Sequence, residues 1–225
     1  MKKIISLILV AVMLTFAFSS CALLAMLNPK EETRYTITSD EWAALCSEFN
    51  YTAVSEGTST VAYNGESDTT ITKDTTMSTA TGRYESIKGL TEEGHETYNN
   101  EYYYTTQDDV RYRINYWTYE ERWVGSEYDW ESESIVGSLG LDEEIKFEDL
   151  VYDADKKAYT YTVTQNDITG TVDFYFENGK LVKMVTVASG SFINGGVTMT
   201  ASATQTTVFS NIGTTVVTIP EYTVN

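Results

Sequence analysis

The side chains most able to do chemistry in this sequence are few and scattered. His95 is its only histidine and stands in the polar run of residues 92–96. A general base or a metal ligand needs a partner, and no second histidine can supply one. The sequence also has no Gly-x-Ser-x-Gly elbow and no phosphate-binding glycine pattern. We therefore expect His95 in a surface loop and predict no catalytic residue, no metal and no cofactor.

Carboxylates offer a second chemistry. Glu127, Asp129, Glu131 and Glu133 alternate around Trp130. A glycosidase uses two such groups, and the distance between them sets the stereochemical outcome. In so acidic a chain the same pattern is typical of a solvated acidic face. We favour the solvated face.

Aromatic side chains gather between Tyr98 and Trp130, in greater number than one face of a sheet can bury. Rings with a polar tip can line an apolar pocket or stack on sugars. They can also pair across strands and only stabilise the sheet. The candidates for lining a ligand cavity are Tyr102, Tyr104, Tyr112, Ile114, Tyr116 and Trp123, together with Trp42, Leu45 and Phe49 from an early helix.

The N-terminus indicates export. Lys2 and Lys3 precede an apolar run from Ile4 to Phe18, and the stretch Phe18-Ser19-Ser20-Cys21 resembles the lipobox of bacterial lipoproteins. We expect residues 1–20 to be a signal peptide, Cys21 to be lipidated, and residues 21–33 to be a tether. The protein would then sit on the extracytoplasmic face of the cell membrane.

Two other fates of the leader remain open. The apolar character continues to Leu27, so an uncleaved anchor from Ile4 to Leu27 is long enough to span a bilayer. Cleavage after Ala22 would instead release a secreted protein. With Cys21 lipidated, Cys46 is the remaining cysteine, and we expect it in the core as a small apolar residue.

Length and charge limit the possible partners. Removing 20 residues from 225 leaves 205, which suits one domain, and we assign it to residues 34–225. The formal charge of −18 becomes −20 without Lys2 and Lys3. Such a charge argues against binding nucleic acid. We expect a monomer.

The positioning elements are mostly strands. Thr38 to Glu41 fits a capping box, and Trp42, Leu45, Cys46 and Phe49 follow at helical spacing, which predicts a helix ending near Asn50. Thereafter period-2 alternation predicts about nine to eleven strands, with hairpin turns at 64–65, 107–109 and 177–180. A short second helix is predicted over 130–139, and strands over 147–152 and 215–219.

So many antiparallel strands must curl, leaving an inner face that helices can cover. We predict a mainly β fold, a strongly curved and half-open barrel with the N-terminal helix and the short second helix packed on its concave face. The early helix at Asp40-Glu41-Trp42, the strand start at Asn50-Tyr51-Thr52, the hairpin over 172–181 and the closing stretch 209–214 resemble half-barrel lipoproteins of the LolA and LppX/LprG type. That resemblance implies a hydrophobic cavity for acyl chains and no catalytic residues.

Two functional hypotheses follow. In the first, a membrane-tethered lipoprotein binds a lipid or another apolar small molecule in a cavity lined by the sheet and by Trp42, Leu45 and Phe49. In the second, the domain has a packed interior and recognises a protein or a glycan through exposed tyrosines and tryptophans.

Overall fold

The computed structural model describes residues 33–137, 145–165, 168–194 and 197–225. The chain divides into two units, Met1–Thr33 and Arg34–Asn225. The predicted signal peptide, Cys21 and the tether up to residue 32 lie outside the described residues. Among the described residues, no helix is both long and apolar enough to span a bilayer.

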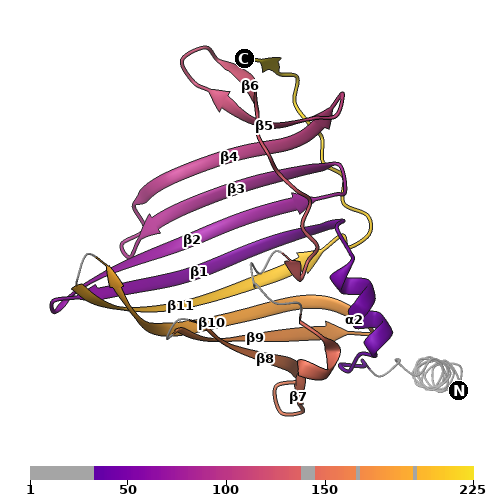
Figure 1. Ribbon diagram of the computed structural model, residues 1–225, viewed down its shortest axis with the longest axis vertical. Coiled ribbons are helices and arrows are strands. Elements are labelled where there is room, and N and C mark those ends of the chain that lie inside the picture. The colour runs from indigo at the N-terminus through magenta and orange to yellow at the C-terminus, as the bar shows by residue number, and fades with distance from the viewer. Residues whose placement is uncertain (1–32, 138–144, 166–167, 195–196) are drawn as a thin grey trace, which may run out of the picture. The chain divides into compact units, whose positions relative to one another are not determined.

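A single twelve-stranded sheet dominates the described domain and curves without closing into a barrel (Figure 1). Its strand order is β12-β6-β5-β4-β3-β2-β1-β11-β10-β9-β8-β7. All neighbours pair antiparallel except β12 and β6, which pair parallel. The elements are α2 (Ser39–Cys46), β1 (Tyr51–Tyr63), β2 (Glu66–Ser78), β3 (Gly82–Thr91), β4 (Glu96–Gln107), β5 (Val110–Trp117), β6 (Arg122–Glu127), η2 (Phe147–Asp149), β7 (Val151–Asp153), β8 (Ala158–Gln165), β9 (Ile168–Glu177), β10 (Lys180–Asn194), β11 (Val197–Ser210) and β12 (Thr223–Val224). The predicted mainly β, half-open fold is confirmed.

Tight turns join the hairpins at the three predicted places. Asn64 and Gly65 both have positive φ, of 51° and 84°, as do Asn178 and Gly179, of 51° and 80°. Two-residue turns of this kind match the right-handed twist of the strands they join. Asp108 and Asp109 make the third turn with φ of 52° and 63°.

Helix α2 begins as predicted but is shorter. Thr38 caps it, and the full capping box with Glu41 is present. The helix ends at Cys46 rather than near Asn50, because Ser47 turns its hydroxyl back to the carbonyls of Ala43 and Ala44. Phe49 therefore lies beyond the helix and is 36% exposed.

Several predicted elements differ in the structure. Strands β3 and β6 were not predicted, and residues 215–219 form no strand. Residues 147–149, predicted as the start of a strand, are the 3-10 helix η2. Of the predicted second helix, residues 130–134 form no helix, 135–136 form a turn, residue 137 is in a 3-10 conformation, and 138–139 lie outside the described residues.

The hydrophobic core lies between α2 and one half of the sheet. Trp42 meets Phe174 of β9 edge-on, with ring centroids 5.1 Å apart, and its indole N–H donates to the carbonyl of Ile145 at 3.0 Å. Leu45 is buried in the same cluster, and Cys46 is half-buried against it. The inner face of the sheet is the one that carries α2 and faces the viewer in Figure 1.

Two extended segments cross the ends of the strands. The strap, residues 128–134, runs in front of the inner face toward α2 (Figure 1). It is held by the Trp130 indole donating to the Thr105 carbonyl at 3.1 Å and by the Ser132 hydroxyl donating to the Ala80 carbonyl at 2.9 Å. The tail is residues 211–225. Near its start, the Gly213 N–H donates to the backbone carbonyl of Asn50 at 2.7 Å, and its end forms β12 beside β6.

Candidate functional site

Beside α2, the inner face is filled by apolar side chains. Trp42 is 3% exposed and Leu45 7%, and both belong to the core cluster with Phe174 and Phe209. These two predicted cavity residues are therefore core residues of the described structure. Any ligand on the inner face must lie farther along the strands, past the helix.

The central cavity opens next to this core and has a volume of about 150 Å³. Its lining comes from five neighbouring strands, β10, β11, β1, β2 and β3. One wall is apolar, and the other carries hydroxyl, amide and charged groups. The lining residues are Tyr51, Ala53, Ser55, Asp74, Thr76, Arg83, Met184, Thr186, Gln205, Thr207 and Phe209.

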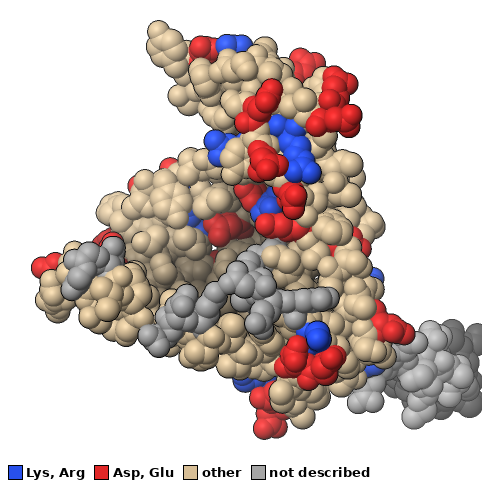
Figure 2. All heavy atoms as spheres, viewed as in Figure 1, with Lys and Arg blue, Asp and Glu red and all other residues tan. Residues whose placement is uncertain are grey.

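The polar wall contains one arginine among several carboxylates. The Arg83 guanidinium pairs with Glu85 at 2.5 Å and with Glu133 of the strap at 3.0 Å. The Tyr104 hydroxyl donates to Glu85 at 2.9 Å. Figure 2 shows acidic and basic side chains gathered beside the hollow of this face. Arg83 is thus already balanced by carboxylates.

Two buried atoms of this wall lack a hydrogen-bond partner within the described structure. They are Oδ1 of Asp74 and Nε of Arg83. Burial, together with the nearby Glu85 carboxylate, raises the pKa of Asp74 above its ordinary value. Buried polar atoms are normally hydrogen-bonded, so a bound molecule that accepts from Arg83 Nε and donates to Asp74 Oδ1 would satisfy both. The wall therefore offers bonding capacity to a polar group that the described residues do not supply.

A floor of small side chains continues from the cavity away from α2. The residues pair across four strands in one row, Gly170 with Ala188, Ala188 with Ala203, and Ala203 with Ser59. Alternation along each strand places this row on the same face as the cavity lining. No side chain of the row extends beyond a hydroxymethyl group. The row therefore presents only small groups on this face.

The aromatic candidates divide between the two faces. Cross-strand pairing and alternation put Tyr102 and Tyr104 on the inner face. Tyr104 packs against Tyr128 and Trp130, at centroid distances of 6.0 and 5.9 Å. Burial and the neighbouring Glu85 raise the pKa of the Tyr104 phenol. These two rings belong to the packing under the strap.

Tyr112, Ile114, Tyr116 and Trp123 lie on the outer face. Trp123 contacts Tyr103 and Tyr116 edge-on, at 5.1 and 5.3 Å, which is cross-strand packing. The structure does not bring them together with Tyr102 and Tyr104. Exposed rings are found at the β5–β6 hairpin, where Tyr116, Trp117 and Tyr119 reach solvent.

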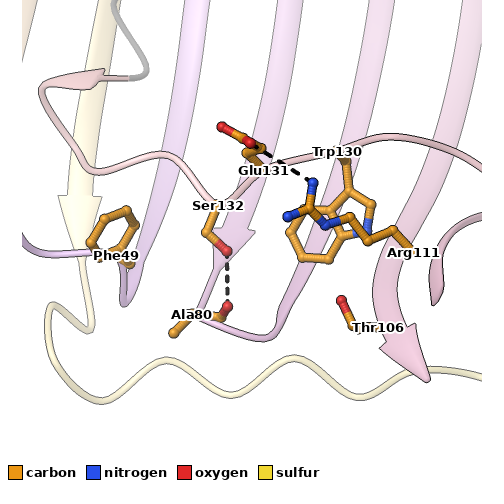
Figure 3. A pocket seen from close by; sticks show the side chains of 7 residues that line it. All are labelled: Phe49, Ala80, Thr106, Arg111, Trp130, Glu131 and Ser132. Carbon is orange, nitrogen blue, oxygen red and sulfur yellow. Dashed lines mark hydrogen bonds and ion pairs between the residues drawn. The ribbon is translucent and has the colours of Figure 1, made fainter. Parts of the chain in front are cut away.

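The strap pocket is a second hollow, of about 390 Å³, at the strand ends beside the strap. Phe49 is the predicted cavity residue that lines it. Figure 3 shows the Phe49 ring on one side and the Trp130 indole with the Arg111 guanidinium on the other. The lining residues are Phe49, Ala80, Thr106, Arg111, Trp130, Glu131 and Ser132.

The acidic residues around Trp130 are engaged with arginines. Arg111 Nη1 lies 2.9 Å from Asp129 and 3.8 Å from Glu131, and Glu133 pairs with Arg83. Glu127 is exposed. His95 is also exposed, just after the turn that joins β3 to β4, where we expected a loop. No group of three potential metal ligands occurs among the described residues.

Sequence reasoning missed Asp74, Arg83 and Arg111. A signal for the first was present, because Asp74 interrupts a run of threonines and apolar residues in a strand. Arg83 and Glu85, two residues apart, must share one face of their strand. Neither pattern shows which face points inward.

No protein-family model matches the chain, and no curated protein matches it. Solved structures similar to it include a DUF1329 family protein from Desulfovibrio piger, 10% identical, with a TM-score of 0.24, covering 81% of this chain and 92% of that one. Another is a domain named for outer membrane lipoprotein sorting, from Vibrio parahaemolyticus, 10% identical, with a TM-score of 0.22, covering 76% of this chain and 88% of that one.

Proposed function

We propose that this protein binds an amphiphilic molecule on the inner face of its half-open sheet and carries out no reaction on it. The apolar chain of the ligand lies along the floor of small residues, and its polar head occupies the central cavity. In this proposal Cys21 is lipidated and holds the domain at the extracytoplasmic face of a membrane, which is also the source of the ligand.

The observation that carries the proposal is the mixed lining of the central cavity. Met184 and Phe209 make an apolar wall that continues the core, whereas Asp74 and Arg83 face the same space with unpaired polar atoms. Ligand sites typically combine a mostly apolar lining with a few polar groups that fix orientation. The Gly170–Ala188–Ala203 row follows on the same face, beyond Thr186 and Gln205, and offers only small side chains to the ligand's chain.

Charge selects the kind of head group. Asp74, Glu85 and Glu133 are three carboxylates, and Arg83 is the cation that two of them already engage. A phosphate would meet net negative charge here, which costs binding energy at short range in a partly buried site. An uncharged hydroxylated head can instead accept from Arg83 Nε and donate to Asp74 Oδ1.

Binding without catalysis agrees with the chemistry of the described residues. The central cavity holds no serine beside a histidine, since His95 lies exposed between β3 and β4. The carboxylates of the strap are paired with Arg83 and Arg111. Their geometry supports holding the strap rather than acid-base work on a substrate.

Native mass spectrometry of the full-length protein, released from detergent in the instrument, tests the proposal. The protein is mixed with equal amounts of monoolein and of oleoyl lysophosphatidic acid, which share a chain and differ in head charge. We expect a monoolein adduct at least about 10-fold more abundant than the phosphate adduct, a difference of about 1.4 kcal/mol. Absence of both adducts would contradict amphiphile binding, and preference for the phosphate would contradict the head-group assignment.

The intact mass in the same spectra also shows how the N-terminus of the protein is processed. A diacylated Cys21 and the loss of residues 1–20 are expected, and a Cys21→Ser variant should lack the acyl mass. An unmodified Cys21 in the native protein would contradict the lipid anchor while leaving the ligand test unaffected.

A further inference from the structure

We propose that the strap pocket is a second binding site and that it takes a saccharide ring. It shares no lining residue with the central cavity, so the inference stands apart from amphiphile binding. Its volume of about 390 Å³ lies within the range of small-molecule sites, about 300–1,000 Å³. Three features of the pocket point to a sugar.

Aromatic rings bound the pocket on two sides. Phe49 is 36% exposed and presents its ring from just beyond α2. Trp130 is fixed opposite by its indole N–H donating to the carbonyl of Thr105, so its orientation is set before any ligand arrives (Figure 3). Preorganised aromatic walls suit the apolar C–H faces of a pyranose ring, which presents hydroxyls only around its edge.

The polar part of the lining offers donors and acceptors together. Arg111 supplies several N–H donors, Glu131 supplies acceptor oxygens, and the Thr106 hydroxyl can do either. Arg111 and Glu131 lie 3.8 Å apart, longer than a direct hydrogen bond. Both groups therefore keep bonding capacity toward a vicinal pair of ligand hydroxyls.

The ion pairs of the pocket are weak enough to be shared with a ligand. The side chains of Asp129 and Glu131 are 95% and 83% exposed, and exposed pairs of this kind contribute about 0–1 kcal/mol. Two carboxylates around one arginine also leave a net negative charge, which disfavours an anionic ligand. A neutral polyhydroxylated ring satisfies the pocket better than a carboxylate or a phosphate does.

Saturation-transfer NMR on the full-length protein, held in a detergent without a sugar head group, tests the inference. The probes are maltose, cellobiose, lactose and N,N′-diacetylchitobiose. We expect transfer to the ring protons of at least one probe, and we expect Arg111→Leu and Phe49→Ala each to weaken that binding at least about 10-fold.

Two matched variants control for nonspecific effects. Arg122→Leu removes an arginine that is also 43% exposed and also paired with a carboxylate, Glu120, away from the pocket. Tyr63→Ala removes a ring of similar exposure, 40%, at the β1–β2 hairpin. Both should bind like the native protein. Transfer to none of the four probes, or equal binding by the Arg111 and Arg122 variants, would overturn the inference.

Discussion

Tyr222 occupies the space that a side chain on Gly125 would need. A Cβ atom built on Gly125 would lie 2.6 Å from the Tyr222 ring. The same ring also packs against Tyr112, with the two ring centroids 6.0 Å apart. The Tyr222 hydroxyl donates to Gln107 at 2.8 Å. The tail is thereby fastened to the outer face of β4, β5 and β6, and β12 covers part of the β6 edge.

Replacing Gly125 by alanine should loosen this contact. The added methyl group must displace the Tyr222 ring, and overpacking of this kind costs about 1–3 kcal/mol. Gly170→Ala is the matched control, because a Cβ there meets its neighbours at 3.5 Å or more. Thermal unfolding should show a clearly lower Tm for Gly125→Ala than for Gly170→Ala. Equal Tm values would show that the tail does not depend on the Tyr222–Gly125 contact.

The buried indole N–H of Trp42 gives a second prediction. Trp42→Phe keeps the aromatic contact with Phe174 but leaves the carbonyl of Ile145 without its donor. An unpaired buried carbonyl costs about 1–3 kcal/mol. Chemical denaturation should therefore show Trp42→Phe destabilised relative to Trp117→Phe, whose side chain is exposed on β5. If the two variants unfold alike, the bond between α2 and residues 145–150 adds little to stability.

Local features of the fold could be predicted because they depend on near neighbours in the sequence. The Asn64-Gly65 and Asn178-Gly179 turns and the Thr38 cap each need only a few adjacent residues. The helix end was predicted too late because Phe49 keeps the helical spacing of Trp42 and Leu45, although the helix already ends at the Ser47 cap. Residues 130–134 of the strap were wrongly predicted to be helical, because the bonds that hold them go to Thr105 and Ala80, far away in sequence.

The site was less predictable than the fold. Period-2 alternation separates Tyr102 from Tyr103, but it does not say which of the two faces is covered. That is decided by where α2 packs, through Trp42 and Phe174. The central cavity depends on the register of β1 with both β2 and β11, which brings Asp74 and Thr207 to either side of Ser55. No short stretch of sequence contains that information.

Asp74 predicts a dependence of stability on pH. Its pKa is raised in the folded protein, so the folded state holds a proton more tightly than the unfolded state. Stability then falls as pH rises from the ordinary aspartate pKa through the raised one. Asp74→Asn, which cannot ionise, should have a higher Tm than the native protein at neutral pH, and the gain should shrink on acidification.

The control for this prediction is Asp68→Asn, an exposed position on the same strand. Thermal scans from about pH 3 to about pH 8 compare the two variants with the native protein. If Asp74→Asn is no more stable than Asp68→Asn at neutral pH, burial of the Asp74 carboxylate is not a cost to the fold.

The proposed amphiphile lies along the inner face of the sheet, and one pair of variants tests this directly. Ala203 is exposed on the inner face of β11, in the floor row, and its neighbour Thr204 is exposed on the outer face. Phenylalanine suits a strand at both positions. Native mass spectrometry of full-length Ala203→Phe and Thr204→Phe with monoolein measures the bound fraction. We predict at least about a 10-fold loss of affinity for Ala203→Phe and none for Thr204→Phe. Equal binding by the two variants would contradict a ligand site on the inner face.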